Sequence, residues 1–177
     1  LHKAFNKYET VISIVSLILF SVTAVMIVPF IRLYTLGVND VDYIMPFFAV
    51  LLILTAVLYC LRLPYHSVVI AAGHFKKTQA AAYGEAIANI VLSILLILRY
   101  DLVGVTIATI IATLYRFLYY VWYLSNNIMY RKKRKFVRRM LINLITFIIN
   151  IVIGVIVYVS AFSLIIKNSF SGKTRYR

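Results

Sequence analysis

Three charged residues stand out because they interrupt otherwise apolar stretches of the sequence: Arg62, Glu85 and Arg116. A charge in the hydrocarbon core of a bilayer costs roughly 2.5–3.5 kcal/mol on insertion scales, so such a side chain usually faces protein or a water-filled cavity. Arginine presents a planar fork of donors that matches phosphate oxygens. These residue types therefore indicate a site for an anionic group, with the glutamate as an ion-pair partner or coupling residue.

The spacing of Glu85 and Arg116 predicts a direct ion pair. Glu85 lies about 10 Å along a helix that begins near residue 78, and Arg116 lies about 15 Å from the end of the next helix, at 1.5 Å per residue. A connection of three residues, 99–101, makes these helices neighbours. The pair could serve only to fasten the two helices, because buried pairs often do no more than neutralise each other. Asn89 follows Glu85 by one turn and shares its face.

Arg62 and His66 form a second group, four residues apart on one helical face. Pro64 lies between them and is expected to break or kink the helix. We therefore predict a candidate site for an anionic head group, such as a lipid phosphate, made by Arg62, His66 and Arg116. The alternative is that Arg62 pairs with Glu85 or with helices absent from this chain.

Residues for catalysis, a cofactor or a metal are not indicated. Cys60 lies in an apolar stretch, where a buried thiol is inert, and one cysteine supports neither a disulfide nor a cysteine metal site. His66 and His74 have no acidic neighbour in sequence. The chain contains no Gly-rich phosphate loop and no pair of carboxylates suited to hydrolysis. We expect a protein that is not an enzyme and needs no cofactor.

The elements that carry these residues are long and apolar. Hydrophobic residues make up 63% of the 177 residues and charged residues 14%, against roughly 45–50% and about 25% in a soluble domain. A membrane helix needs about 20 apolar residues, and continuous runs exclude the alternation of barrel strands. We predict an all-α integral membrane protein whose residues 1–177 form one polytopic domain with five transmembrane helices, at 10–33, 43–73, 78–98, 102–125 and 140–166.

The net charge of +14 predicts orientation, because Lys and Arg in short loops stay in the cytoplasm. The basic segment 131–139, the 74–77 connection and the N-terminal segment all fall on one side, so the N-terminus is predicted to be cytoplasmic. A basic cluster between two spans indicates contact with anionic membrane lipids and no nucleic acid. The opposite side receives Asp40 and Asp42, but also the C-terminal cations, which contradict the rule: Lys167, Lys173, Arg175 and Arg177.

The order of residues from the second to the fourth predicted helix resembles a known family. Ala72-Gly73 precede Lys76 and Lys77, Glu85 is followed by Asn89, and Gly104 is followed by Ala108-Thr109. This pattern, over about residues 10–130, is similar to the C-terminal half of polysaccharide and O-antigen unit flippases. These belong to the multidrug/oligosaccharidyl-lipid/polysaccharide exporter superfamily.

The resemblance implies a fold and a function. Such exporters have two six-helix bundles around a central cavity, and alternating access moves undecaprenyl-pyrophosphate-linked oligosaccharides across the bacterial cytoplasmic membrane. This chain would be a partial second bundle, and its partner would be the missing N-terminal helical bundle. A further span beyond residue 177 would account for the conflicting C-terminal charges.

Two other functions remain open at this point. A multidrug or cation antiporter of the same superfamily is expected to show excess carboxylate within its spans, where this chain has Glu85. A non-transporting membrane scaffold would use the same polar residues for packing alone. Small residues at helical spacing, Gly104, Ala108 and Ala112, are best explained by close helix packing in either case.

Overall fold

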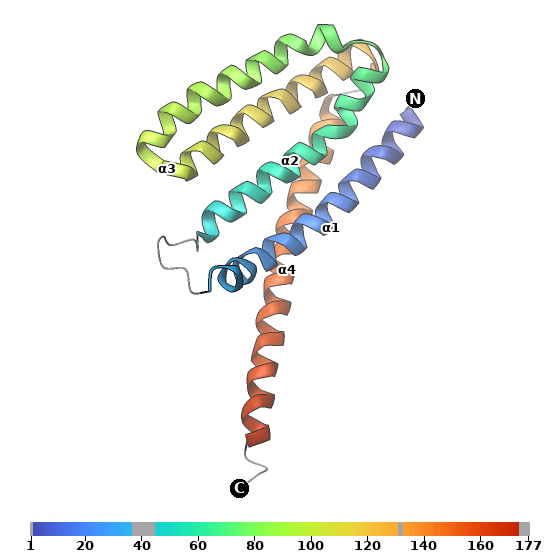
Figure 1. Cartoon of the computed structure of the whole chain (residues 1–177). Coiled ribbons are helices and arrows are strands. Elements are labelled where there is room, and N and C mark those ends of the chain that lie inside the picture. Colours follow the sequence, from blue (N-terminus) through green and yellow to red (C-terminus); the bar gives the residue numbers. More distant parts are fainter. Residues whose placement is uncertain (1, 37–44, 131–132, 174–177) are drawn as a thin grey trace.

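The fold is all-helical. A computed structural model describes residues 2–36, 45–130 and 133–173, with side chains at all of these except 133 and 161–173. Within these ranges there are four helical elements and no strand: α1 (His2–Tyr34), α2 (Pro46–Ala71), α3 (Phe75–Asn127) and α4 (Lys133–Lys173) (Figure 1). All four are long and apolar enough to cross a membrane. The prediction of an all-α, multi-pass membrane protein is confirmed at this level.

The predicted count of five separate helices is wrong, because the structure has four helical elements in its described residues. The predicted helices 78–98 and 102–125 are two arms of one element, α3. Its 53 residues are helical throughout except at Asp101, where φ is 48° and ψ is −136°. The chain reverses there, and residues 75–100 and 102–127 lie side by side as two arms (Figure 1). The connection expected at 99–101 is thus one residue long, since the flanking residues keep helical backbone geometry up to the turn.

The helix ends also differ from those predicted. α1 begins at His2 instead of residue 10, and α4 begins at Lys133 instead of residue 140. An apolar run marks only the part of a helix that crosses hydrocarbon, whereas the helix itself can continue into the polar interface. Asp40, Asp42, Arg175 and Arg177 lie outside the described residues.

A glycine ends α2. Gly73 has a φ of 71°, the amide of His74 donates to the Val69 carbonyl, and the amide of Gly73 donates to the Ile70 carbonyl. This is the Schellman arrangement, in which a left-handed residue satisfies the last carbonyls of a helix. The break expected at Pro64 does not occur, because α2 continues through that residue.

Two buried apolar clusters hold the helices together. The larger cluster lies near the first residues of α1 and α4 and the last residues of α2. The second arm of α3 also ends there. The aromatic members of this cluster are Phe5, Tyr65, Phe117, Tyr120, Tyr123 and Phe136. The smaller lies further along the bundle and joins α1, α2 and α4 through Leu17, Ile53, Val57, Leu61 and Phe147. The start of α1, the connection 72–74 and residues 128–130 after α3 therefore lie at one end of the bundle.

Large apolar side chains cover the outside of the molecule. In the most apolar window of α3 only 11% of residues are buried, and in that of α4 only 6%. The C-terminal part of α4 extends away from the other helices (Figure 1). Surfaces of this kind require hydrocarbon or other helices around them, which agrees with a membrane location.

Candidate functional site

Two arginines share one glutamate between α2 and the two arms of α3. The Arg62 Nη1 donates to Glu85 Oε1 at 2.6 Å, and the Arg116 Nη1 donates to Glu85 Oε2 at 2.5 Å. We call these residues the arginine triad. Its formal charge is +1, since two guanidinium groups face one carboxylate. The hairpin at Asp101 creates this geometry by placing Arg116 opposite Glu85.

Aromatic side chains position both guanidinium groups. The Arg116 Nε and Nη2 donate to the Tyr120 hydroxyl at 3.3 and 3.0 Å, one helical turn away. The Arg62 guanidinium lies 4.6 Å from the centre of the Tyr59 ring, where a cation–π attraction adds to the ion pair. The Arg62 side chain is 9% exposed, against 19% for Arg116. Arg116 is thus the more accessible cation of the triad.

A pocket of about 310 Å³ opens beside Arg116 between α2 and α3. Its walls combine one cation with a histidine, hydroxyl and amide groups and apolar side chains: His66, Ile70, Phe75, Thr78, Gln79, Ala82, Arg116 and Tyr120. Donors of this kind fit the oxygens of an anionic group. The pocket lies in the half of the bundle where α2 ends and α3 begins.

The structure brings together most, but not all, of the residues predicted as a site. The expected ion pair between Glu85 and Arg116 is present. Arg62 joins the same carboxylate, which was the alternative left open for it. His66 lines the pocket with Arg116, and its ring lies 5.6 Å from that of Tyr120.

Asn89 connects the two arms of α3. Its Oδ1 accepts hydrogen bonds from the hydroxyls of Ser93 and Thr109, each at 3.3 Å. The contact with Thr109 links the two arms, so Asn89 supports the hairpin. Its predicted role beside Glu85 in ion pairing or coupling stays a prediction.

Sequence reasoning missed a second buried carboxylate. Glu9 on α1 is 3% exposed, and its Oε1 accepts a hydrogen bond from the Tyr65 hydroxyl at 2.6 Å. Its Oε2 lies 3.1 Å from the Arg139 Nη1, within ion-pair distance but without hydrogen-bond geometry. We call Glu9, Tyr65 and Arg139 the Glu9 cluster. It joins α1, α2 and α4.

The sequence pattern that could have revealed this cluster is a row of polar residues on one face of an apolar helix. Glu9, Ser13 and Ser21 recur on one face of α1, and all are buried. On α4, Arg139 donates to the Thr10 hydroxyl, and the Asn143 amide donates to the Ser13 hydroxyl at 3.0 Å. Glu9 and Arg139 each lie one residue before a predicted span, 10–33 and 140–166, where a charge indicates only orientation.

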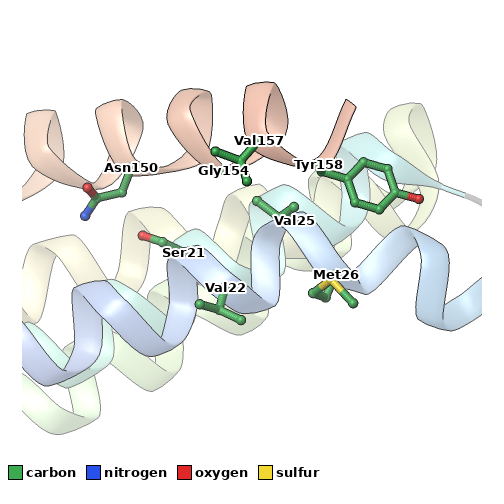
Figure 2. A pocket seen from close by; sticks show the side chains of 8 residues that line it. All are labelled: Ser21, Val22, Val25, Met26, Asn150, Gly154, Val157 and Tyr158. Atoms are coloured by element: carbon green, nitrogen blue, oxygen red, sulfur yellow. The ribbon is translucent and has the colours of Figure 1, made fainter. Parts of the chain in front are cut away.

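Further along α1 and α4, side chains of both helices line an apolar cavity of about 310 Å³. Figure 2 shows Ser21, Val25 and Met26 on α1 facing Asn150, Gly154 and Tyr158 on α4. At Gly154 the two helices come so close that an added Cβ would meet Val25 Cγ2 at 2.6 Å. The cavity is distinct from the pocket at Arg116 in both composition and position.

Within the described residues, no three His, Cys, Asp or Glu side chains gather as they would around a metal ion. No protein-family model, no curated protein and no solved structure matches this chain. A functional assignment therefore depends on the chemistry of the site itself.

Proposed function

We propose that this chain is the substrate-binding part of a membrane translocator for lipid-linked oligosaccharides, which carry an undecaprenyl pyrophosphate. One observation supports the proposal above all others. The arginine triad carries net positive charge inside the bundle, and its accessible member, Arg116, lines a pocket with His66. Intramembrane cations at a polar pocket are suited to a diphosphate that must cross hydrocarbon.

The proposal includes a location and partners. The chain would lie in the bacterial cytoplasmic membrane with its N-terminus in the cytoplasm, in contact with membrane lipids. The translocation pathway would be completed by an N-terminal helical bundle outside this sequence, as the family resemblance implies. The pocket would then be nearer the cytoplasmic surface, because it lies at the end of the bundle that carries Lys76 and Lys77.

A cation or drug antiporter is a weaker explanation of the same geometry. Its substrate would need free carboxylate, whereas Glu85 already has an arginine on each oxygen. A scaffold role is weaker because Arg116 lines an open pocket, and a residue that serves only packing does not need one.

Binding to a defined lipid pyrophosphate tests the proposal. The purified 177-residue chain in phosphatidylcholine nanodiscs is titrated with farnesyl pyrophosphate, with farnesol as the uncharged analogue. We expect binding of the pyrophosphate only, and a loss of at least about tenfold in affinity in Arg116→Ala, or about 1.4 kcal/mol. Arg99→Ala is the matched control, since Arg99 is an exposed cation of the same helix away from the pocket.

Two outcomes would contradict the proposal. One is equal binding of farnesol; the other is unchanged affinity in Arg116→Ala. Saturable binding of a lipophilic cation such as ethidium that requires Glu85 would instead favour the antiporter. In cells, the chain joined to an N-terminal bundle should lose surface polysaccharide when Arg62 and Arg116 are both replaced by Ala. Normal polysaccharide with a stable double variant would reject a cationic substrate site.

A further inference from the structure

The accessible arginine of the triad keeps unused hydrogen-bonding capacity. A guanidinium has five N–H groups. Arg116 directs one Nη1 hydrogen at Glu85, and its Nε and Nη2 each donate to Tyr120. Two N–H groups remain, one on each terminal nitrogen. Arg116 lines the pocket, whereas Glu85 and Arg62 do not. An anion that enters the pocket therefore meets Arg116 first.

Glu85 opposes that anion while supporting the fold. Its Oε2 is 2.5 Å from the Arg116 Nη1, so a phosphate oxygen on the same guanidinium would lie within roughly 6 Å, about two hydrogen-bond lengths. Charges at this separation in a partly buried site interact strongly, because the effective dielectric constant is far below that of water. Arg62 acts in the opposite sense, since it draws the other oxygen of Glu85 and offsets part of its charge.

We propose that Glu85 is an internal counter-ion that limits the affinity of the pocket for pyrophosphate, so that the bound substrate can leave. The inference rests on the proposed function, because it assigns a role to Glu85 within the same site. Transport requires binding that is strong enough for entry and weak enough for exit. Two unopposed arginines would hold a diphosphate in the membrane, whereas one net positive charge allows it to dissociate.

This role predicts affinity changes of opposite sign in two variants. Glu85→Gln removes the opposing charge and keeps an oxygen that can accept from either arginine. We expect its affinity for pyrophosphate to rise by about tenfold. The rise should come from slower dissociation of the bound pyrophosphate. Arg62→Met leaves Glu85 to Arg116 alone and brings the net charge of the site to zero. We expect its affinity to fall by about tenfold, although Arg62 does not line the pocket.

The experiment measures binding and dissociation rates of the full chain in phosphatidylcholine nanodiscs, with inorganic pyrophosphate and farnesyl pyrophosphate as separate probes. The control is Glu9→Gln, which changes the net charge of the chain by the same amount at a carboxylate outside the pocket. Circular dichroism and gel filtration establish that each variant is folded. If Glu85→Gln binds both probes more tightly, the pocket recognises the diphosphate itself. If it binds only farnesyl pyrophosphate more tightly, the pocket recognises the diphosphate of a lipid.

The outcomes separate this inference from the proposed function. If the wild-type chain binds neither probe, the proposed function itself is rejected. If the wild type binds but Glu85→Gln binds equally or more weakly, the counter-ion role is overturned and the binding site stands. If Glu85→Gln does not fold, Arg62→Met decides: weakened binding supports the role, and unchanged or tighter binding overturns it. Equal tightening in Glu9→Gln would show an effect of overall charge and would also overturn it.

Discussion

The two carboxylates inside the helical bundle have contrasting environments. Glu85 contacts two arginines, its side chain is 18% exposed, and one of those arginines faces an open pocket. Glu9 contacts one arginine and one tyrosine, and its side chain is 4% exposed. The first group carries an excess of positive charge beside a pocket, whereas the second is neutral as a pair, with a buried carboxylate and an arginine that is 28% exposed.

This contrast separates a binding role from a structural one. An electrically balanced ion pair with a buried carboxylate stabilises helix contacts, and loss of its arginine leaves an uncompensated charge. An unbalanced group beside a pocket retains attraction for an outside ion. The Glu9 cluster therefore joins α1, α2 and α4, and the contrast supports the ligand-binding role that we propose for the arginine triad.

The largest effect on stability is expected from breaking the Glu9 cluster. Arg139→Leu leaves the Glu9 carboxylate buried with only the Tyr65 hydroxyl, and should lower the free energy of unfolding by about 3 kcal/mol. SDS titration in mixed micelles, followed by circular dichroism, measures this. The matched control is Arg138→Leu, since Arg138 is the exposed neighbour of Arg139. Equal stability of the two variants would mean that the Glu9 cluster contributes nothing to the fold.

The next effect compares the helix contacts around the two clusters. In α3, a Cβ added at Gly104 would lie 2.4 Å from the Leu96 carbonyl oxygen, so the arms that hold the arginine triad must separate. Between α1 and α4, a Cβ at Gly154 meets only the end of the Val25 side chain. Gly104→Ala should cost about 2 kcal/mol and Gly154→Ala about 1 kcal/mol, measured by the same SDS titration. The reverse order would show that α1 and α4 are the more rigid pair.

A smaller effect compares two tyrosine hydroxyls on equally buried rings. Tyr65 and Tyr120 are 2% and 1% exposed, and each hydroxyl contacts one of the clusters. Tyr65→Phe removes a donor to a sealed carboxylate and should cost about 1.5 kcal/mol, whereas Tyr120→Phe should cost less than about 1 kcal/mol. The smaller cost for Tyr120→Phe is expected because the N–H groups of Arg116 can donate to water in the open pocket instead. Thermal unfolding in detergent distinguishes the two, and a larger loss in Tyr120→Phe would contradict the contrast.

The smallest effect concerns the turn that assembles the arginine triad. Asp101 has a positive φ in a region that glycine occupies freely. Asp101→Gly should stabilise the chain by about 0.5 kcal/mol, as relief of backbone strain exceeds the added freedom of the unfolded chain. Asp101→Val is the opposite control, because a β-branched residue is unfavourable there. Their thermal unfolding midpoints should lie on either side of the wild-type value; the same midpoint for both would show an unstrained turn.

Sequence reasoning located the apolar helices and the Glu85–Arg116 pair for the same reason. A charge within a long apolar run is rare enough to identify, and a short connection between two runs sets Glu85 and Arg116 at equal depth. The reasoning failed where charges lay at the ends of runs. Glu9 and Arg139 fell just outside the predicted spans, because hydropathy alone does not show that α1 and α4 extend into the interface.

The sequence alone determined that the chain is helical and membrane-embedded, and that Glu85 and Arg116 meet. These follow from apolar length, loop length and the rise of a helix, which are properties of neighbouring segments. Only the tertiary structure decided that Arg62 shares Glu85, that His66 joins Arg116 at a pocket, and that Glu9 is buried against Arg139. The partners in those contacts depend on how the helices rotate about their axes and cross one another, which side-chain packing determines.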